Sequence, residues 1–196
     1  MTQALIAPHG GKLITNLAGA DEQAELRQLA RNIPQIEIGS RQLADLEMLA
    51  NGAYSPLTGF FTRNDYLSVV QDMHLSNGLP WSIPITLSTT TEQAAQLKEG
   101  EPVALVNGAG ELQAVLQVQE KYTYDKRLEA RSVYRTEEEA HPGVRVLYQQ
   151  GDVLLGGPVR VVALQQQVFA HYRYTPEQSR QLFTERGWKR VVGFQT

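Results

Sequence analysis

The spacing of hydrophobic positions predicts three helices in the first third of the chain. Apolar side chains recur there at intervals of three and four residues, the period of one face of a helix. We expect the helices to begin at Asp21, Ser40 and Thr62, because short polar side chains cap free backbone N–H groups. Their predicted ends are Pro34, Asn51-Gly52 and Val70. A short strand is expected between the first two helices, over residues 35–38.

From about residue 82 the pattern changes to short β-strands separated by glycine-containing turns. A charged helix over Asp125–Arg135 interrupts them, and Gly108-Ala109-Gly110 is typical of a hairpin turn. The predicted strands are Ser82–Ser88, Pro102–Asn107, Glu111–Glu120, Val144–Tyr148 and Val153–Val162. Several short strands with few helices favour a small, partly closed barrel within a mixed α+β fold.

The loop Ala53–Phe61 is unusually rich in large apolar and aromatic side chains for a connection. We expect Tyr54, Leu57, Phe60 and Phe61 to fill the core rather than to contact a ligand. Its serine and threonine hydroxyls have no evident base nearby in the sequence, so a nucleophile is not indicated.

The last 30 residues predict a helix followed by a strand. Thr175, Pro176 and Gln178 form a capping-box start, and Gly187 is suited to the left-handed end of the helix. The segment Trp188–Thr196 is predicted as a buried strand, which would begin an α/β domain after a seam at Gln165–Gln167. Ligands of such domains bind at the carboxyl ends of the strands. That end is Gln195-Thr196, where the chain is expected to be truncated.

Composition narrows the possible functions without naming one. A net charge of −3 argues against nucleic-acid binding, and the absence of cysteine excludes thiolate metal sites and cysteine nucleophiles. No signal peptide or membrane span is predicted, so we expect a cytoplasmic location and no membrane partner. The four histidines are too far apart for a metal site, and Glu137–Glu139 is expected to be a solvated end of a helix or loop. Catalytic residues do not emerge from spacing.

Five phrases in order resemble the ATP sulfurylase (sulfate adenylyltransferase) family. Residues 46–66 are similar to the amino-terminal signature of that family, and so are residues 77–87, 141–144 and 151–158. The fifth phrase, from Thr175-Pro-Glu through Gly187-Trp188 to Phe194-Gln-Thr196, resembles the entry into the catalytic domain of the family.

This resemblance implies a PUA-like barrel over residues 1–168, followed at 169–196 by the first helix and strand of a Rossmann-like nucleotidyltransferase domain. The family joins MgATP and sulfate into adenosine 5′-phosphosulfate and pyrophosphate, with Mg²⁺ entering as MgATP. Its sulfate motif reads Gln-Thr-Arg-Asn-Pro and is followed by a His-x-x-His pair. The resemblance assigns sulfate and ATP binding to Gln195 and Thr196, with Gln195 as a donor to sulfate and Thr196 shaping the loop. No catalytic residue and no metal ligand is assigned within this chain.

The segment alone is therefore expected to be inactive, and its parent is expected to form a homo-oligomer. Two alternatives remain at this stage. In the first alternative to an enzyme fragment, the chain is a non-catalytic, RNA-binding PUA-like module. In the second, it is a scaffold whose unpaired carboxyl-terminal strand pairs with another subunit. Fusion to an adenylylsulfate kinase domain is left open by the sequence.

Overall fold

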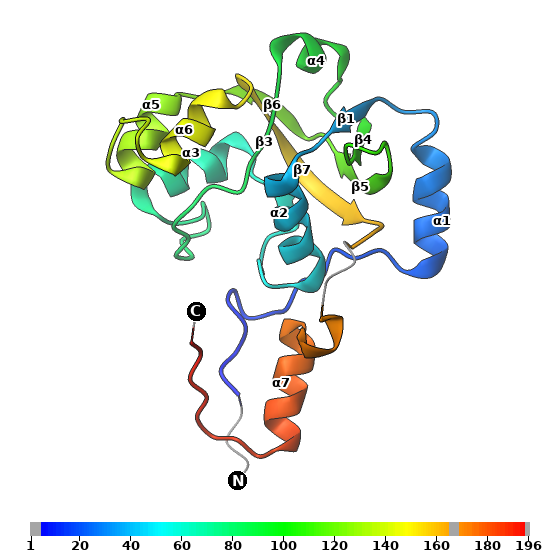
Figure 1. Ribbon diagram of the computed structural model, residues 1–196, viewed down its shortest axis with the longest axis vertical. Helices are drawn as coiled ribbons and strands as arrows, with labels where there is room; N and C mark the ends of the chain where they lie inside the picture. Colours follow the sequence, from blue (N-terminus) through cyan, green and yellow to red (C-terminus); the bar gives the residue numbers. More distant parts are fainter. Residues whose placement is uncertain (1–4, 165–168, 195–196) are drawn as a thin grey trace.

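Strand β7 (Val153–Val161) runs through the middle of the β-sheet and pairs with four other strands, all antiparallel. The computed structural model describes residues 5–164 and 169–194. The first half of β7 pairs with β3 (Leu87–Thr89) and β6 (Glu120–Thr123). Its second half pairs with β2 (Gly59–Phe60) and β5 (Leu112–Gln117). Because different neighbours flank its two halves, the sheet curls around β7, which confirms the predicted mixed α+β fold with a partly closed barrel (Figure 1).

The sheet continues from β5 to β4 (Pro102–Val106), which pairs antiparallel with it, and then to β1 (Gln35–Glu37), which is parallel to β4. Asn107 closes the predicted hairpin, since its side-chain oxygen accepts hydrogen bonds from Ala109 N and Glu111 N at 3.0 and 2.9 Å. The predicted strand over residues 111–120 is instead two strands, β5 and β6. The chain bends between them so that each pairs with a different half of β7.

Helices surround the sheet and gather at its two ends (Figure 1). Helices α3, α5 and α6 cluster at one end and α1 lies at the other, while α7 projects away beside both termini. In the described ranges the α-helices are α1 (Ala20–Leu29), α2 (Ser40–Asn51), α3 (Arg63–Asp72), α4 (Thr91–Gln96), α5 (Lys126–Glu129), α6 (Pro142–Gln149) and α7 (Pro176–Glu185). A π-helical turn, Ala130–Tyr134, continues α5, and a 3₁₀ turn, Ala170–Tyr172, precedes α7.

The first three helices are confirmed, and so is Thr62 as the N-cap residue of α3, but the predicted caps of α1 and α2 are wrong. Glycines 19 and 39 occupy the N-cap positions of α1 and α2, so Asp21 and Ser40 lie inside these helices. At α3, Thr62 is the N-cap residue but its side chain makes no capping bond. Asp65 instead accepts hydrogen bonds from the backbone N and the hydroxyl of Ser76, at 2.9 and 2.6 Å. Thr62 and Asp65 therefore do not form a capping box at the start of α3.

Two predicted strands are wrong. Residues 144–148 belong to α6, which begins at His141 and Pro142 and buries Val144 and Leu147, three residues apart on one face. The His141 ring nitrogen Nδ1 accepts a hydrogen bond from Gly143 N at 3.2 Å and caps the helix. The histidine cap followed by proline at the first helical position is therefore the start of a helix and not of a strand. The predicted strand over residues 82–88 contributes only its end to β3, and Pro84 inside it has no backbone N–H to donate to a ladder.

The aromatic loop after α2 fills the core, as predicted. Leu57, Phe60 and Phe61 are buried, and Tyr54 is half-buried beside them. Ser55 is also buried, and its hydroxyl donates to the carbonyl of Gly52 at 2.7 Å while accepting from Ile14 N at 2.8 Å. The hydroxyl is therefore structural.

Three glycines permit backbones to cross at the middle of β7. A Cβ built on Gly59 would lie 2.0 Å from the carbonyl oxygen of Gly157. One built on Gly156 would meet Phe61 O at 2.5 Å, and one on Gly157 would meet Gln117 O at 2.1 Å. These distances are far below van der Waals contact, so the curl of the sheet requires residues without Cβ here.

A buried carboxyl group lies under the helical end of the molecule. Glu129, the last residue of α5, is 3% exposed, and the Tyr66 hydroxyl donates to its Oε2 at 2.9 Å. The rings of Tyr122 and Tyr124 lie 5.8 Å from that of Tyr66. Burial raises the pKa of Glu129, while the Tyr66 hydrogen bond and the charge of Arg41 act in the opposite direction.

This burial predicts a stability that falls as the pH rises. At a pH above 4.5, the ordinary pKa of a glutamate, the unfolded chain has released the proton that Glu129 still holds in the folded protein. The Glu129→Gln variant keeps the acceptor for Tyr66 but cannot ionise. We therefore expect the wild-type free energy of unfolding to fall with pH above 4.5 more steeply than that of the variant, in urea titrations across pH 4–8. Exposed Glu138→Gln is the matched control, and parallel curves for wild type and Glu129→Gln would contradict the assignment.

The glycine crossing predicts a second effect on stability. In Gly59→Ala the new methyl group clashes with the backbone of the neighbouring strand, and no side-chain rotation can relieve the clash. We therefore expect a loss of about 3 kcal/mol or more in the free energy of unfolding. Gly193→Ala is the control, since nothing lies within 4 Å of its built Cβ and its expected effect is within about 0.5 kcal/mol. Equal effects in urea unfolding would show that the crossing is not tight.

Candidate functional site

Helix α7 is defined by its own capping residues, as the sequence predicts. Thr175 Oγ1 accepts a hydrogen bond from Gln178 N at 3.2 Å, and Gln178 Oε1 accepts one from Thr175 N at 2.9 Å. Pro176 is the first helical residue, and Gly187 takes the left-handed conformation just after the helix, with φ of 63°. These local bonds aim the chain that follows.

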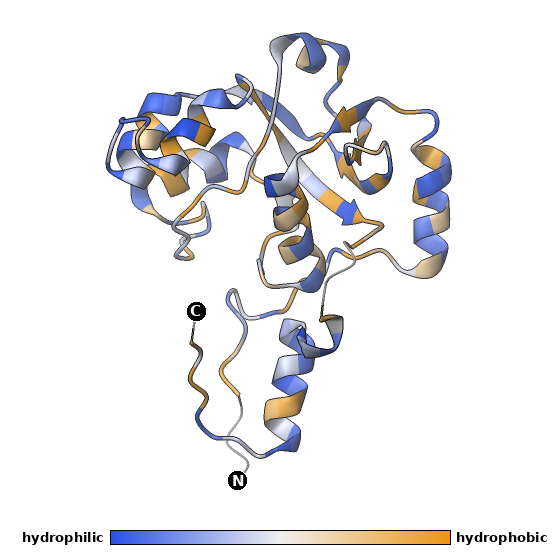
Figure 2. Cartoon of the chain, viewed as in Figure 1, coloured by the Kyte–Doolittle hydropathy of each residue, from blue (hydrophilic) through white to orange (hydrophobic). Residues whose placement is uncertain are grey.

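The segment Trp188–Phe194, hereafter the tail, is extended but pairs with no strand in the described part of the chain. The predicted strand is therefore wrong over these residues, because a strand needs a neighbour to satisfy its backbone groups. The Trp188 ring stacks on Phe183 of α7 at 5.9 Å, which fixes the start of the tail. Farther along, Val192 and Phe194 are 75% and 90% exposed, and the tail is largely apolar (Figure 2).

The two residues that the resemblance assigns to sulfate and ATP, Gln195 and Thr196, lie outside the described residues. The predicted seam at residues 165–167 lies outside them as well. The structure thus describes the approach to the predicted site but not its two named side chains.

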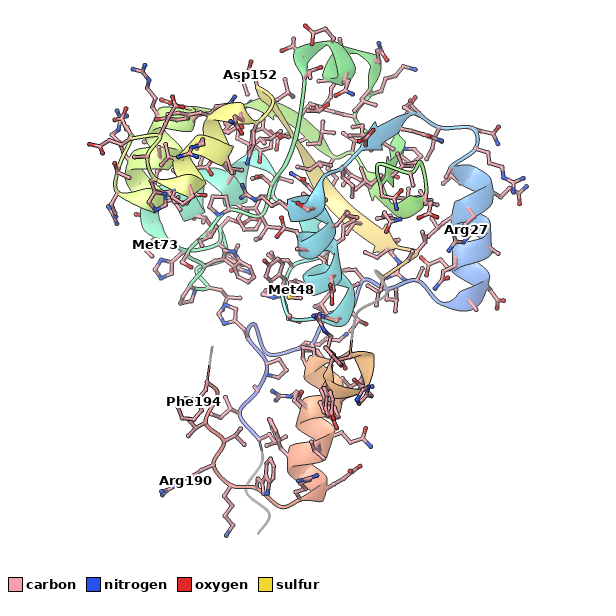
Figure 3. The ribbon with its side chains drawn as sticks, viewed as in Figure 1. Arg27, Met48, Met73, Asp152, Arg190 and Phe194 are labelled. Carbon is pink, nitrogen blue, oxygen red and sulfur yellow. The ribbon has the colours of Figure 1, made fainter. Side chains whose placement is uncertain are left out.

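Positive charge is concentrated in the segment that leads to Gln195. Residues 169–194 contain five arginine or lysine side chains against two glutamates, a net of +3, whereas the whole chain carries −3. Arg190 extends from the tail away from α7, with Phe194 farther along the same segment (Figure 3). The guanidinium of Arg186 lies 5.1 Å from the centre of the Trp188 ring. The positive charge of residues 169–194, in a chain that is acidic as a whole, favours an anionic ligand.

Two arginines join this carboxyl-terminal part to the rest of the molecule. Arg180 of α7 donates to the carbonyl of Ile6, and Arg173 lies 3.7 Å from the carboxylate of Glu47 on α2. The amino-terminal segment runs between α7 and the tail (Figure 1), where Leu5 and Ile6 line a cavity of about 460 Å³. The orientation of the tail therefore depends on the amino-terminal segment as well as on α7.

A larger cleft, of about 1110 Å³, opens between α2, α6 and the loop that follows α3. Its walls are mostly apolar, and Arg41 and Asp45 of α2 are among its few charged residues. Burial raises the pKa of Asp45 against the opposing charge of Arg41 and the hydrogen bond from Tyr54. Burial and the neighbouring Asp45 raise the pKa of Tyr54 to about 12. No sequence motif predicts this cleft, although the four-residue spacing of Arg41 and Asp45 indicates that they share one face of α2.

Other candidate groups are not brought together. Within residues 5–164 and 169–194, no three histidine, aspartate or glutamate side chains are placed to hold a metal ion. Glu137 pairs with Arg131 at 2.9 Å rather than with a second catalytic carboxylate. Among the helices that the structure describes, none is long and apolar enough to cross a bilayer.

Comparison with known proteins connects these features. Residues 6–164 match a family model described as a PUA-like domain, and residues 170–196 match one described as ATP-sulfurylase. A protein named sulfate adenylyltransferase from Synechococcus sp. (strain JA-3-3Ab) is 53% identical over 97% of this chain and 49% of its own length. One of the same name from Synechocystis sp. (strain ATCC 27184 / PCC 6803 / Kazusa) is 50% identical over 98% of this chain and 50% of its own length.

The chain thus spans about half the length of the curated relatives that it matches. A solved structure entitled "Hexameric APS kinase from Thiobacillus denitrificans" superposes with a TM-score of 0.72 and 32% identity, covering 95% of this chain and 33% of that one. The resemblance to ATP sulfurylase drawn from the sequence phrases is confirmed. The chain belongs to the PUA-like domain family, and its carboxyl-terminal residues match the ATP-sulfurylase family.

Proposed function

We propose that this chain is the amino-terminal part of a sulfate adenylyltransferase, which forms adenosine 5′-phosphosulfate and pyrophosphate from ATP and sulfate. The observation that carries the proposal is identity of 50% or more over nearly the whole chain to two proteins of that name, together with the ATP-sulfurylase match at residues 170–196. We further propose that residues 1–168 form the PUA-like domain and residues 169–196 the start of the catalytic domain.

The positive charge of residues 169–194 supports a role for Gln195 and Thr196 in binding the anionic substrates. Gln195 is a neutral donor, so its amide N–H can bind a sulfate oxygen without a change of protonation. Thr196 would shape the loop beside it. The basic residues of 169–194 lower the electrostatic cost of bringing sulfate toward a triphosphate.

In the proposed reaction a sulfate oxygen attacks the α-phosphorus of ATP, the new P–O bond forms, and pyrophosphate leaves with the electrons of the bond that breaks. Two anions must approach in line, so catalysis is mainly a matter of positioning and of neutralising charge. Mg²⁺ would arrive with ATP and neutralise charge on its phosphates. The described residues contribute to the orientation of the tail, through the α7 caps and the Phe183–Trp188 stack.

Two further features of the parent protein are proposed. A homo-oligomer is favoured because the related solved structure is described as hexameric. A cytoplasmic location is favoured by the absence of cysteine, which is compatible with a reducing compartment.

The first test joins this chain, through Thr196, to the part of the Synechococcus sp. (strain JA-3-3Ab) relative that follows its matched half. We expect the hybrid to release pyrophosphate from MgATP only when sulfate is present. The 196-residue chain alone should show no release above background, because one glutamine and one threonine cannot neutralise the transition state. A folded hybrid without sulfate-dependent release would contradict the proposed function, and turnover by the chain alone would contradict its predicted inactivity.

The second test examines Gln195 in the same hybrid. Gln195→Glu replaces a donor with a carboxylate that repels sulfate, so we expect kcat/KM for sulfate to fall by roughly 10²-fold or more. Gln149→Glu, on the exposed side of α6, adds the same charge elsewhere and should leave kcat/KM within about twofold. Equal kinetics for the two variants would remove Gln195 from the site.

A further inference from the structure

The cleft between α2, α6 and the loop after α3 has the features of a second small-molecule site. Its volume of about 1110 Å³ is ample for a compound with two or three rings. Apolar and aromatic side chains form most of its lining, with a few polar groups between them. Met73, labelled in Figure 3, lies at its rim and is 46% exposed. Mostly apolar walls with a few convergent polar groups are typical of ligand pockets.

The indole of Trp81 provides a rigid apolar wall. Its Nε1 donates to the carbonyl of Ile83 at 2.8 Å, so the ring offers no free polar atom to the cleft. Tyr54 packs edge-on against the indole with ring centres 5.7 Å apart and an interplanar angle of 81°, and Phe61 lies 6.4 Å away at 65°. These contacts hold the indole in one orientation, which favours stacking of a planar ring over binding of a flexible chain.

Arg41 and Asp45 place a donor beside an acceptor in the lining of the same cleft. They are four residues apart on α2, so their side chains leave the same face of the helix. Asp45 Oδ1 accepts a hydrogen bond from the Tyr54 hydroxyl at 3.2 Å. Burial raises the pKa of Tyr134, and the nearby charge of Arg41 opposes that rise. Within the described residues no ion pair joins Arg41 to Asp45, although their charges interact. The pair can therefore receive a ring edge that carries an N–H donor next to an acceptor atom.

The net charge of the residues that line the cleft disfavours the binding of anionic ligands. Its formally charged lining residues are Arg41, Asp45 and Asp72, a net of −1. The two histidines of the lining are already engaged with backbone carbonyls, His9 Nε2 with Pro80 O at 3.0 Å and His74 Nδ1 with Asp72 O at 2.6 Å. Sulfate and nucleotide phosphates are therefore disfavoured here, and the cleft is distinct from the proposed substrate site.

We propose that this cleft binds an uncharged planar heteroaromatic ring with adjacent donor and acceptor atoms, the chemistry of a purine nucleoside, stacked near Trp81 with its edge on Arg41 and Asp45. The ring's N–H donates to the carboxylate of Asp45, and its acceptor nitrogen or oxygen receives a hydrogen bond from the guanidinium of Arg41. This site goes beyond the proposed function and does not depend on it.

The two tryptophans of the chain allow a direct binding test. With Trp188→Phe, Trp81 is the only tryptophan, and adenosine is titrated in the absence of sulfate and Mg²⁺. We expect a saturable change of Trp81 fluorescence with a Kd below about 1 mM. N6,N6-dimethyladenosine lacks the donor and should bind at least tenfold more weakly, and AMP should bind more weakly than adenosine at low salt. Calorimetry on the unsubstituted chain gives the same measurement should Trp188→Phe impair folding.

Variants identify the groups that recognise the ring. Arg41→Met and the isosteric Asp45→Asn should each weaken adenosine binding at least tenfold, with Tm followed by circular dichroism to exclude unfolding. Arg131→Met removes a cation that pairs with Glu137 and is not among the lining residues, so it should leave Kd unchanged. No saturable binding of adenosine, equal binding of the dimethyl analogue, or tighter binding of AMP would each overturn the proposal. Because the assay contains no sulfate and no turnover, its failure leaves the pyrophosphate-release test unaffected.

Discussion

The close approach of three backbone segments at the centre of β7 is the constraint on which the rest of the fold depends. At Gly156 and Gly157 the strand changes partners, from β3 and β6 to β2 and β5. The neighbouring carbonyls of Phe61 and Gln117 lie where a side chain would be. Only residues without Cβ allow the sheet to curl so tightly. The curl brings the aromatic loop after α2 against the core and places α2 beside the loop that carries Trp81.

Two acidic side chains are enclosed near a single cation at the helical end of the molecule. Glu129 and Asp45 are both buried, and the charge of Arg41 acts on both. The hydroxyls of Tyr66 and Tyr54 donate hydrogen bonds to Glu129 and Asp45, so both buried groups have partners. The cleft therefore combines mostly apolar walls with a few polar and charged groups. It owes this character to packing at the helical end of the molecule rather than to any sequence motif.

The sequence predicted best those elements whose causes are local. The α7 capping box, the turn at Gly187 and the hairpin closed by Asn107 each depend on residues within five positions, and all three are present. Predictions failed where a distant partner decides the outcome. Thr62 makes no capping bond at α3 while Asp65 of the same turn bonds Ser76, and Val144 and Leu147 face a helical cluster rather than a sheet. The cleft was missed because Arg41, Asp45 and Trp81 meet only after the chain has folded.

The tail shows the same division between local and distant causes at the proposed substrate site. Its start is determined locally, by the stacking of Trp188 on Phe183, and its β-branched and aromatic residues are typical of a strand. Its pairing is a property of neighbours, and none of the described segments provides them. Phe194 is consequently 90% exposed, although residues of this kind are normally buried. A sulfate site built on Gln195 therefore requires surroundings that cover this apolar edge, because a flexible side-chain donor on an unpaired backbone cannot be held within the narrow tolerance that in-line attack demands.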